Sequence, residues 1–199
     1  MRVLVACEFS GIVREAFKAR GHDAWSCDLL PTEIPGNHIQ GDVLEILNDG
    51  WDLMIAHPPC TYLSKAGARW LYVNGHINSQ RYEYGLLARE FFFALFTSSI
   101  NKIVIENPTP LKIYNLPKYS QVVQPYEFGH PYSKRTLLWI KGLPNLIPTQ
   151  VINEYVPYLP SNTGGAKRNQ KHSKGISRNS KESSKTFPGI ANAMAEQWG

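Results

Sequence analysis

Residues 1–21 read MRVLVACEFSGIVREAFKARG, a pattern that predicts a β-strand, a tight turn and an α-helix in succession. The apolar run at 2–6 predicts a buried strand, and Phe9-Ser10-Gly11 predicts the turn. Beyond the turn, apolar residues recur at helical spacing over 12–19, and Gly21 stands where a helix typically ends. A buried strand followed directly by a helix is a building unit of α/β folds.

The same alternation of apolar runs and helical patterns continues along the chain. Strands that alternate with helices predict a Rossmann-like α/β fold with a mainly parallel central sheet flanked by helices. With 199 residues and no internal repeat, we expect a single domain spanning 1–199, with its late strand pair antiparallel. The expected strands are 24–27, 37–40, 51–56, 102–105, 121–124 and 135–140, and the expected helical segments are 43–47, 79–98 and a terminal helix from about Gly189.

Composition excludes several classes of protein. Hydrophobic residues make up 43% of the chain, too many for a wholly disordered protein, and no apolar run approaches the ~20 residues of a membrane-spanning helix. The three cysteines, Cys7, Cys27 and Cys60, are an odd number at wide spacings and match neither a disulfide framework nor a zinc site. We therefore expect no metal, no membrane association and a reducing, cytoplasmic location.

The positive charge is concentrated in one segment. The chain has a net charge of +5 at pH 7, yet residues 161–186 alone carry +6 and the remaining 173 residues carry −1. This stretch is rich in Ser, Asn, Lys and Gly, which predicts a flexible loop. Such a loop is either a solvated surface segment or a binding element for an anionic partner such as nucleic acid.

Polar residues follow five of the expected strands, and in a parallel sheet the ligand site lies beyond the carboxyl ends of the strands. Asp28 is either a carboxylate that accepts from ribose hydroxyls or an exposed acid that caps a loop. Asp42 either accepts from an adenine amino group or caps the next helix. The Phe9-Ser10-Gly11 turn either opens a helix whose first amides receive an anionic group or is only a tight turn. The full set is Glu8 to Gly11, Asp28, Asp42, Cys60 and Glu106.

Two proline motifs carry the strongest chemical signal. His57-Pro58-Pro59-Cys60 ends a buried strand, and its prolines hold the Cys60 thiol over the edge of the sheet, where a thiolate can act as a nucleophile. Glu106-Asn107-Pro108 places an acid at the neighbouring strand end, suited to a general acid or a hydrogen-bond partner. Cys7 and Cys27 belong to apolar strands and are interpreted as inert, buried thiols.

Taken in order over residues 2–198, these motifs resemble the cytosine-C5 DNA methyltransferase family, and most closely its small, phage-type members. The resemblance covers the Phe-Ser-Gly turn, the acid after the second strand, the Gly-Asp pair, Pro-Pro-Cys, Glu-Asn-Pro, a basic element in a late strand and a terminal Gly-x-x-Asn helix. It implies a class I methyltransferase fold, S-adenosylmethionine as cofactor, DNA as substrate and a location in a bacterial or phage-infected host cell. Cysteine in the fourth position of His57-Pro58-Pro59-Cys60 argues against methylation of an exocyclic nitrogen, because enzymes of that class hold an aromatic residue there.

The resemblance also implies roles for individual residues. Cys60 is the nucleophile that adds to C6 of cytosine, Glu106 holds or protonates N3, and Arg135 supports the base and Glu106. The cofactor site is formed by Phe9, Ser10, Gly11, Asp28, Asp42, Pro58 and Asn192, the last on a terminal helix at 187–199 that completes the site. Aromatic residues near the catalytic loop either stack on an extruded base or pack beneath the loop: Tyr62, Trp70, Tyr72 and His76.

The family normally carries a sizeable target-recognition domain between the late strands and the terminal helix. Here residues 148–186 hold only a loop with the flexible basic segment. Cations in such a segment bind phosphates with little sequence readout. The residues assigned to nucleic-acid binding are Lys134, Lys167, Arg168, Lys171, Lys174 and Arg178.

Departures from the family pattern keep alternatives open. Val13 and Arg14 replace glycines of the cofactor loop, Thr61 replaces the usual residue after the cysteine, and Leu137 replaces a second arginine. One alternative is the same chemistry on a free cytosine nucleotide or on RNA. The other is a weakly catalytic protein that binds cofactor or DNA.

Overall fold

The computed structural model describes residues 1–159 and 180–199, and its centre is a seven-stranded sheet in the order β3-β2-β1-β4-β7-β10-β8. The first five strands in this order are parallel, whereas β10 is antiparallel to both β7 and β8. This confirms the mainly parallel sheet and the late antiparallel strand pair. The strands are β1 (Arg2–Ala6), β2 (Asp23–Asp28), β3 (His38–Gln40), β4 (Leu53–Ala56), β7 (Lys102–Asn107), β8 (Gln121–Val123) and β10 (Thr136–Lys141).

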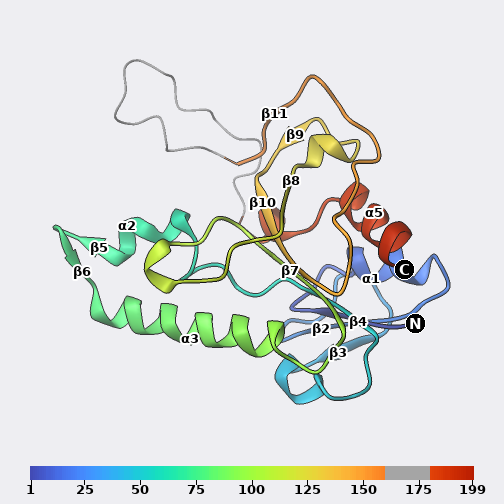
Figure 1. The fold of residues 1–199 in the computed structure, drawn as a ribbon, viewed down its shortest axis with the longest axis horizontal. Coiled ribbons are helices and arrows are strands. Elements are labelled where there is room, and N and C mark those ends of the chain that lie inside the picture. The colour runs from blue at the N-terminus through green and yellow to red at the C-terminus, as the bar shows by residue number, and fades with distance from the viewer. Residues whose placement is uncertain (160–179) are drawn as a thin grey trace.

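Helices cover both faces of this sheet, so the molecule has three layers (Figure 1). Alternate side chains of β1 point to opposite faces: Val3 and Val5 pack with α1 (Ile12–Lys18) and α5 (Pro188–Trp198), whereas Leu4 and Ala6 pack with α3 (Ser79–Phe96) and the short helix η1 (Val43–Ile46). The buried strand residues are mostly apolar, as expected for a sheet covered on both sides; the polar ones among the described residues are Ser26, Asn107 and Thr136.

The strand order places a topological switch point between β1 and β4. Chain connections from β1 lead towards β2 and β3 on one side, and those from β4 lead towards β7 on the other. In open α/β sheets ligands bind in the crevice outside the carboxyl ends of the two strands at such a point. The residues that follow Ala6 and Ala56 therefore occupy the expected position of a ligand site.

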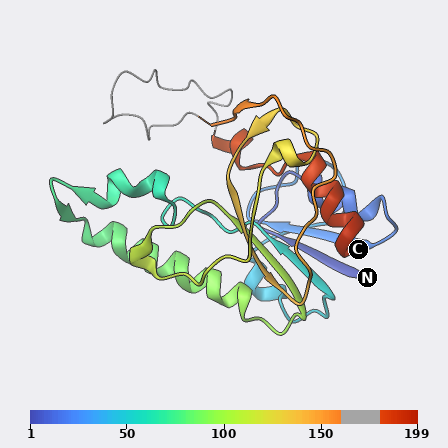
Figure 2. The same ribbon diagram turned by 45° about the horizontal axis from the view of Figure 1, so that its top comes forward.

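An arm that sequence patterns did not predict lies between β4 and α3. We define the arm as residues 61–84; it comprises η2 (Lys65–Gly67), α2 (Ala68–Leu71), a hairpin of β5 (Tyr72–Val73) and β6 (His76–Ile77), and the first turns of α3. Figures 1 and 2 both show it projecting away from the central sheet. Its base is tied to the segment after β7, where Leu111 donates its backbone amide to the Leu63 carbonyl at 2.7 Å.

The arm has a small core of its own. Leu63, Leu71 and Tyr114 are buried together, and Tyr114 belongs to η3 (Lys112–Tyr114) beyond β7. The Tyr114 ring lies directly against Gly85 of α3, where a Cβ atom would come within 2.1 Å of the tyrosine hydroxyl. A glycine in the middle of this helix is thus explained by close packing rather than by a bend.

The interval 148–186 is only partly described by the structure. The interval contains β11 (Val156–Pro157) and α4 (Ser180–Ser184), which precedes α5. β11 pairs with β9 (Tyr132–Ser133), a strand before the interval, and a short helix, η4 (Pro125–Glu127), lies between β8 and β9. Of the helices in residues 1–159 and 180–199, none is long and apolar enough to cross a membrane. The predicted nucleic-acid contacts Lys167, Arg168, Lys171, Lys174 and Arg178 lie outside the described residues.

Candidate active site

The two proline motifs emerge side by side at the edge of the sheet. β4 and β7 are parallel neighbours with Ala56 opposite Ile105, so the chain segments after them leave the sheet together. Asn107, which is buried, donates its Nδ2 hydrogen to the Pro58 carbonyl at 2.9 Å and ties the two exits to each other. The sheet therefore brings the catalytic candidates Cys60 and Glu106 to one place.

Glu106 and His57 form a buried ion pair in this place. The Oε2 atom of Glu106 lies 3.2 Å from Nδ1 of His57, and the two side chains are only 11% and 12% exposed. Thr186 donates its hydroxyl to the same oxygen at 3.1 Å. Burial alone raises the pKa of Glu106, but the hydrogen bond and charge of His57, with help from Lys134 and Thr186, outweigh burial and lower the pKa to about 2.

The proton of this pair resides on His57. Burial lowers the pKa of His57, but the hydrogen bond and negative charge of Glu106 outweigh burial and raise the pKa above its ordinary value of 6.5. The opposite ring nitrogen, Nε2, is buried without a hydrogen-bond partner among the described residues, as is Oδ1 of Asn107. Buried polar atoms are normally partnered. Among the described residues, these two atoms of the proline motifs are therefore free to bond to a ligand or a water molecule.

Cys60 is partly buried beside these groups. Burial raises the pKa of its thiol above the ordinary value of 9.0; its own backbone amide and Lys134 lower the pKa, and Glu106 raises it. Near neutral pH the thiol therefore carries its proton, which it must lose before it can act as the predicted thiolate nucleophile. We call His57, Cys60 and Glu106 the sheet-edge site.

Lys134, rather than Arg135, supplies positive charge to the sheet-edge site. Lys134 acts on the pKa of each of its three members, and its Nζ atom donates to the carbonyl of Lys185 at 3.4 Å. Arg135 is exposed and donates to the hydroxyl of Tyr119 at 3.2 Å. Neighbouring residues of an extended chain point in opposite directions, which explains the difference.

The first turn of α1 is closed to an external anion by Glu8. The Glu8 carboxylate is buried and accepts from the backbone amides of Val13 and Arg14 at 2.7 and 3.2 Å, and from the Ser10 hydroxyl at 3.1 Å. Ser10 in turn accepts from the amide of Ile12 at 3.3 Å. These amides already have an acceptor, so the expectation that they receive an anionic group is not met. Gly11 begins the helix with a φ of 76°, which explains the glycine.

A cavity of about 290 Å³ lies at the carboxyl ends of β1, β2 and β3 and extends to α3 and the Pro-Pro loop. Asp28 and Asp42 both line it, and each also accepts a backbone amide two residues on, from Leu30 at 2.9 Å and Leu44 at 3.0 Å. The helix-capping interpretation of Asp42 is thus confirmed, and it does not exclude a ligand contact. The lining residues are Cys7, Cys27, Asp28, Leu29, Gly41, Asp42, Val43, Pro59, Ala88 and Phe91.

The other residues assigned to the cofactor lie elsewhere. Of the described residues, those lining the cavity do not include Phe9, Ser10, Gly11, Pro58 or Asn192. Pro58 is buried beneath the loop, where its carbonyl holds Asn107, and its neighbour Pro59 faces the cavity instead. Asn192 is exposed on α5, whose apolar residues pack against α1 and the sheet.

A strap formed by residues 181–187 crosses the same edge. Glu33 receives the ammonium groups of Lys181 and Lys185 at 3.0 and 2.7 Å, and Lys181 also lies 5.0 Å from the centre of the Phe9 ring. Thr186 then reaches Glu106. The strap therefore joins the loop after β1 to the sheet-edge site and covers part of it.

Sequence reasoning missed several of these residues. His57 precedes Pro58-Pro59-Cys60, and its position beside an acidic strand end was a usable signal. Thr186 is 80 residues from Glu106, and no local pattern links them. Phe91 was recognised only as part of the helix.

The arrangement combines a thiol, a charged acid–imidazole pair and a cavity with two carboxylates. Within residues 1–159 and 180–199, no group of three or more His, Cys, Asp or Glu is arranged to hold a metal ion. Comparison of the chain with protein-family models and with curated protein sequences gives no match.

Proposed function

We propose that the protein transfers a methyl group from S-adenosylmethionine to C5 of cytosine in DNA, through a covalent bond between Cys60 Sγ and ring C6. The observation that carries this proposal is the meeting of Cys60, Glu106 and His57 at one sheet edge, with a two-carboxylate cavity adjoining it at Pro59. A thiol beside a proton-carrying acid pair suits addition to an electron-poor ring.

The cavity residues fit the nucleoside part of the proposed cofactor. Asp28 and Asp42 each use one carboxylate oxygen on a backbone amide, which leaves the other suited to ribose hydroxyls or an adenine amino group. Phe91, Ala88 and Val43 supply apolar contacts for a flat ring. When bound, S-adenosylmethionine supplies an electrophilic methyl group.

The chain's own residues account for the rest of the chemistry. Cys60 gives its proton to solvent, and its sulfur forms a bond to C6 as the C5=C6 π bond breaks and electron density moves towards C5 and N3. The Glu106–His57 pair holds one proton, with His57 as its carrier, and can share or deliver it at N3 through Glu106. With the cofactor bound, C5 would take the methyl group as the methyl–sulfonium bond breaks. C5 would then lose its hydrogen as a proton to solvent, and the Cys60–C6 bond would break with its electron pair returning to the Cys60 sulfur. Lys134 stabilises negative charge on Cys60 throughout.

A covalent trapping experiment tests this proposal. An oligonucleotide with a single 5-fluorocytosine cannot lose a proton from C5, so transfer to it leaves the enzyme bound. We expect wild-type protein with S-adenosylmethionine to give an adduct that resists denaturation. Cys60→Ala gives none, whereas Glu196→Gln, which breaks only the exposed ion pair with Arg20, retains it.

The outcomes of that experiment are distinct. An adduct with Cys60→Ala would show that another group is the nucleophile. Failure of the wild-type protein to form an adduct between pH 7 and 9 would contradict methyl transfer to cytosine. Parallel reactions with dCMP and with RNA separate the alternative substrates.

Binding without efficient transfer is a second candidate function. One observation favours it: burial raises the pKa of Cys60 and keeps the thiol protonated near neutral pH. Tight binding of S-adenosylmethionine in calorimetry, together with no adduct at any pH, would support this candidate.

A further inference from the structure

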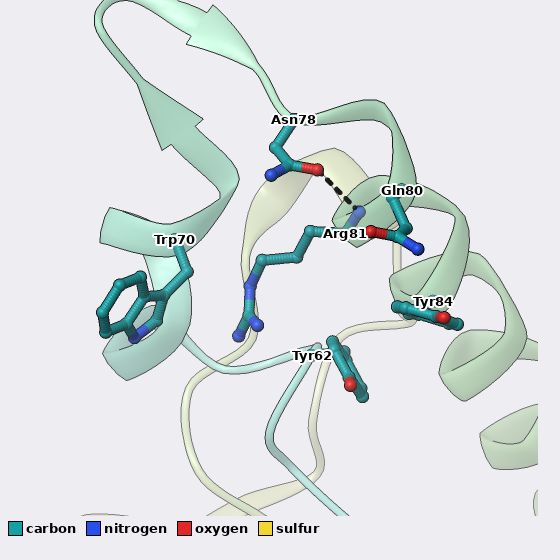
Figure 3. A pocket seen from close by; sticks show the side chains of 6 residues that line it. All are labelled: Tyr62, Trp70, Asn78, Gln80, Arg81 and Tyr84. Atoms are coloured by element: carbon teal, nitrogen blue, oxygen red, sulfur yellow. Dashed lines mark hydrogen bonds between the residues drawn. The ribbon is translucent and has the colours of Figure 1, made fainter.

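A second pocket, of about 340 Å³, lies in the arm and directly follows the catalytic cysteine in the chain (Figure 3). It opens between α2 and the first turns of α3, and aromatic rings and polar side chains alternate along its wall. It is lined by Tyr62, Trp70, Asn78, Gln80, Arg81 and Tyr84.

The centre of this pocket is a set of planar groups. The Arg81 guanidinium lies 4.9 Å from the centre of the Tyr62 ring, and the Tyr62 and Tyr84 rings are 5.2 Å apart. Trp70 is 56% exposed, and Figure 3 shows the guanidinium pointing between its ring and Tyr62. Exposed rings and a guanidinium plane are the groups on which unstacked nucleobases stack.

Arg81 is held in this position by the chain that carries Cys60. Its Nη2 atom donates to the Thr61 carbonyl at 2.8 Å, and Asn78 accepts from its backbone amide at 3.0 Å. Gly67 leaves room for this bond, because a Cβ there would lie 2.7 Å from both Arg81 Nη2 and the Thr61 oxygen. The pocket and the Cys60 loop therefore form one connected unit.

The charge around the pocket matches a polyanion. The arm, residues 61–84, carries three cations, Lys65, Arg69 and Arg81, against a single acid, Glu83. Arg69 is exposed and its guanidinium lies 4.8 Å from the centre of a Trp70 ring. Cations interleaved with exposed aromatic rings are typical of surfaces that follow a single nucleic-acid strand.

We propose that the arm pocket binds an unstacked nucleobase next to the target cytosine in a single strand of nucleic acid. That the target base beside the pocket is a cytosine rests on the function proposed above. The stacking of a flanking base in the pocket does not rest on it. The exposed Trp70 ring and the Arg81 guanidinium, which is itself backed by Tyr62, contact the faces of the flanking base. Asn78 and Gln80 lie at its polar edge. The arm thus holds the strand while the sheet-edge site holds the cytosine.

An abasic scan tests the proposal. A fluorescein-labelled single-stranded oligonucleotide with one cytosine is prepared with an abasic site at each flanking position in turn, and its affinity is measured by anisotropy without cofactor. We expect removal of the base at one flanking position to lower the affinity by about 5- to 100-fold, the range expected for one stacked base. The Trp70→Ala variant should bind the intact oligonucleotide more weakly by a similar factor. It should bind the oligonucleotide that lacks the base at the sensitive position no more weakly than it binds the intact one.

Matched variants separate the pocket from general effects of the arm. Tyr72→Ala removes an exposed ring of the same arm that does not line the pocket, and Arg89→Gln removes a positive charge of α3 outside it. Both are expected to bind within about twofold of wild type. The same RNA sequence is measured beside the DNA to separate the two sources of the base.

Each result supports or overturns the pocket independently of methyl transfer. Coupling between Trp70→Ala and one abasic position supports the pocket even when 5-fluorocytosine gives no adduct. An adduct without coupling at any position overturns the pocket and leaves the transfer proposal standing. Equal losses in Trp70→Ala and Tyr72→Ala also overturn it.

Discussion

The sheet-edge site and the arm adjoin each other along the chain but are built in opposite ways. At the sheet edge, parallel strands bring buried ionisable groups together, and burial with close charges shifts their pKa values. In the arm, short elements around a small core that is shared with the segment after β7 leave aromatic and cationic side chains facing solvent. Reaction chemistry benefits from desolvated, fixed charges, whereas contact with a long polymer needs exposed planar groups. The two regions should therefore respond differently to substitution.

Loss of the acid at the sheet edge is the largest effect we expect. Glu106→Gln keeps the shape of the side chain but removes the charge that holds the proton on His57. Methyl transfer is expected to fall by roughly 10²–10⁴-fold, the range for a positioned acid–base group. Oligonucleotide affinity, measured by anisotropy, stays within about twofold of wild type. An equal loss of affinity would show that the two regions are not separable.

Removal of His57 tests whether the buried pair stabilises the fold. His57→Asn leaves Glu106 buried without its partner and is expected to cost about 3–5 kcal/mol in the free energy of unfolding near pH 6. The pKa of Glu106 is lowered, so its contribution is present above its ordinary value of 4.5 and is lost as pH falls towards about 2. The pKa of His57 is raised, so its contribution is complete below 6.5 and is lost as pH rises through the raised value.

The difference between wild type and His57→Asn should therefore be greatest between about pH 4.5 and 6.5 and should shrink at higher pH. Urea unfolding from pH 4 to 9 measures it. Glu196→Gln is the control, because it breaks the exposed ion pair with Arg20 and should cost at most about 1 kcal/mol. A constant difference across this range would contradict the proposed location of the proton.

The packing beneath the arm is tested through the contact between Gly85, which directly follows the arm in α3, and Tyr114. Gly85→Ala places a methyl group into the Tyr114 ring and is expected to destabilise the protein by roughly 1–3 kcal/mol. Because Tyr114 also stacks on Tyr82, the displacement reaches the first turns of α3 and weakens oligonucleotide binding. Leu87→Ala, at an exposed position of the same helix, serves as control in urea unfolding and anisotropy. Stronger binding by Gly85→Ala would contradict a preformed pocket.

The two regions also differ in how much of them the sequence predicts. Long-range pairing of β4 with β7 follows from the α/β pattern, so the meeting of Cys60 with Glu106 was predictable from two strand ends. The arm was not, because strands of two residues and a single-turn helix leave no periodicity to detect.

Side-chain direction was equally hidden. Lys134 and Arg135 are adjacent in sequence, and only the path of the chain into β10 decides which one faces Cys60. In the same way Glu8 could be placed at a strand end, but its use of the α1 amides depends on the exact turn.

The smallest effect that we expect comes from removing the charge of Lys134 rather than that of Arg135. Lys134 lowers the pKa of Cys60, so Lys134→Gln should leave the thiol more protonated at a given pH. One pKa unit is tenfold in thiolate, and we expect alkylation of Cys60 by iodoacetamide at pH 8 to slow by roughly two- to tenfold. Arg135→Gln removes the neighbouring charge and should leave the rate unchanged, since Arg135 contacts Tyr119 instead.

Mass spectrometry assigns the alkylation to individual thiols. Cys27 is buried and its pKa is raised to about 11, and burial also raises the pKa of Cys7, so both should react more slowly than Cys60. The Cys60 rate should rise with pH up to and beyond 9, because the thiolate is the reactive form and its pKa is raised. If Arg135→Gln slowed the alkylation of Cys60 and Lys134→Gln did not, Arg135 would be the residue whose charge lowers the pKa of the thiol. The exposed side chain before β10, and not the partly buried one, would then influence the thiol.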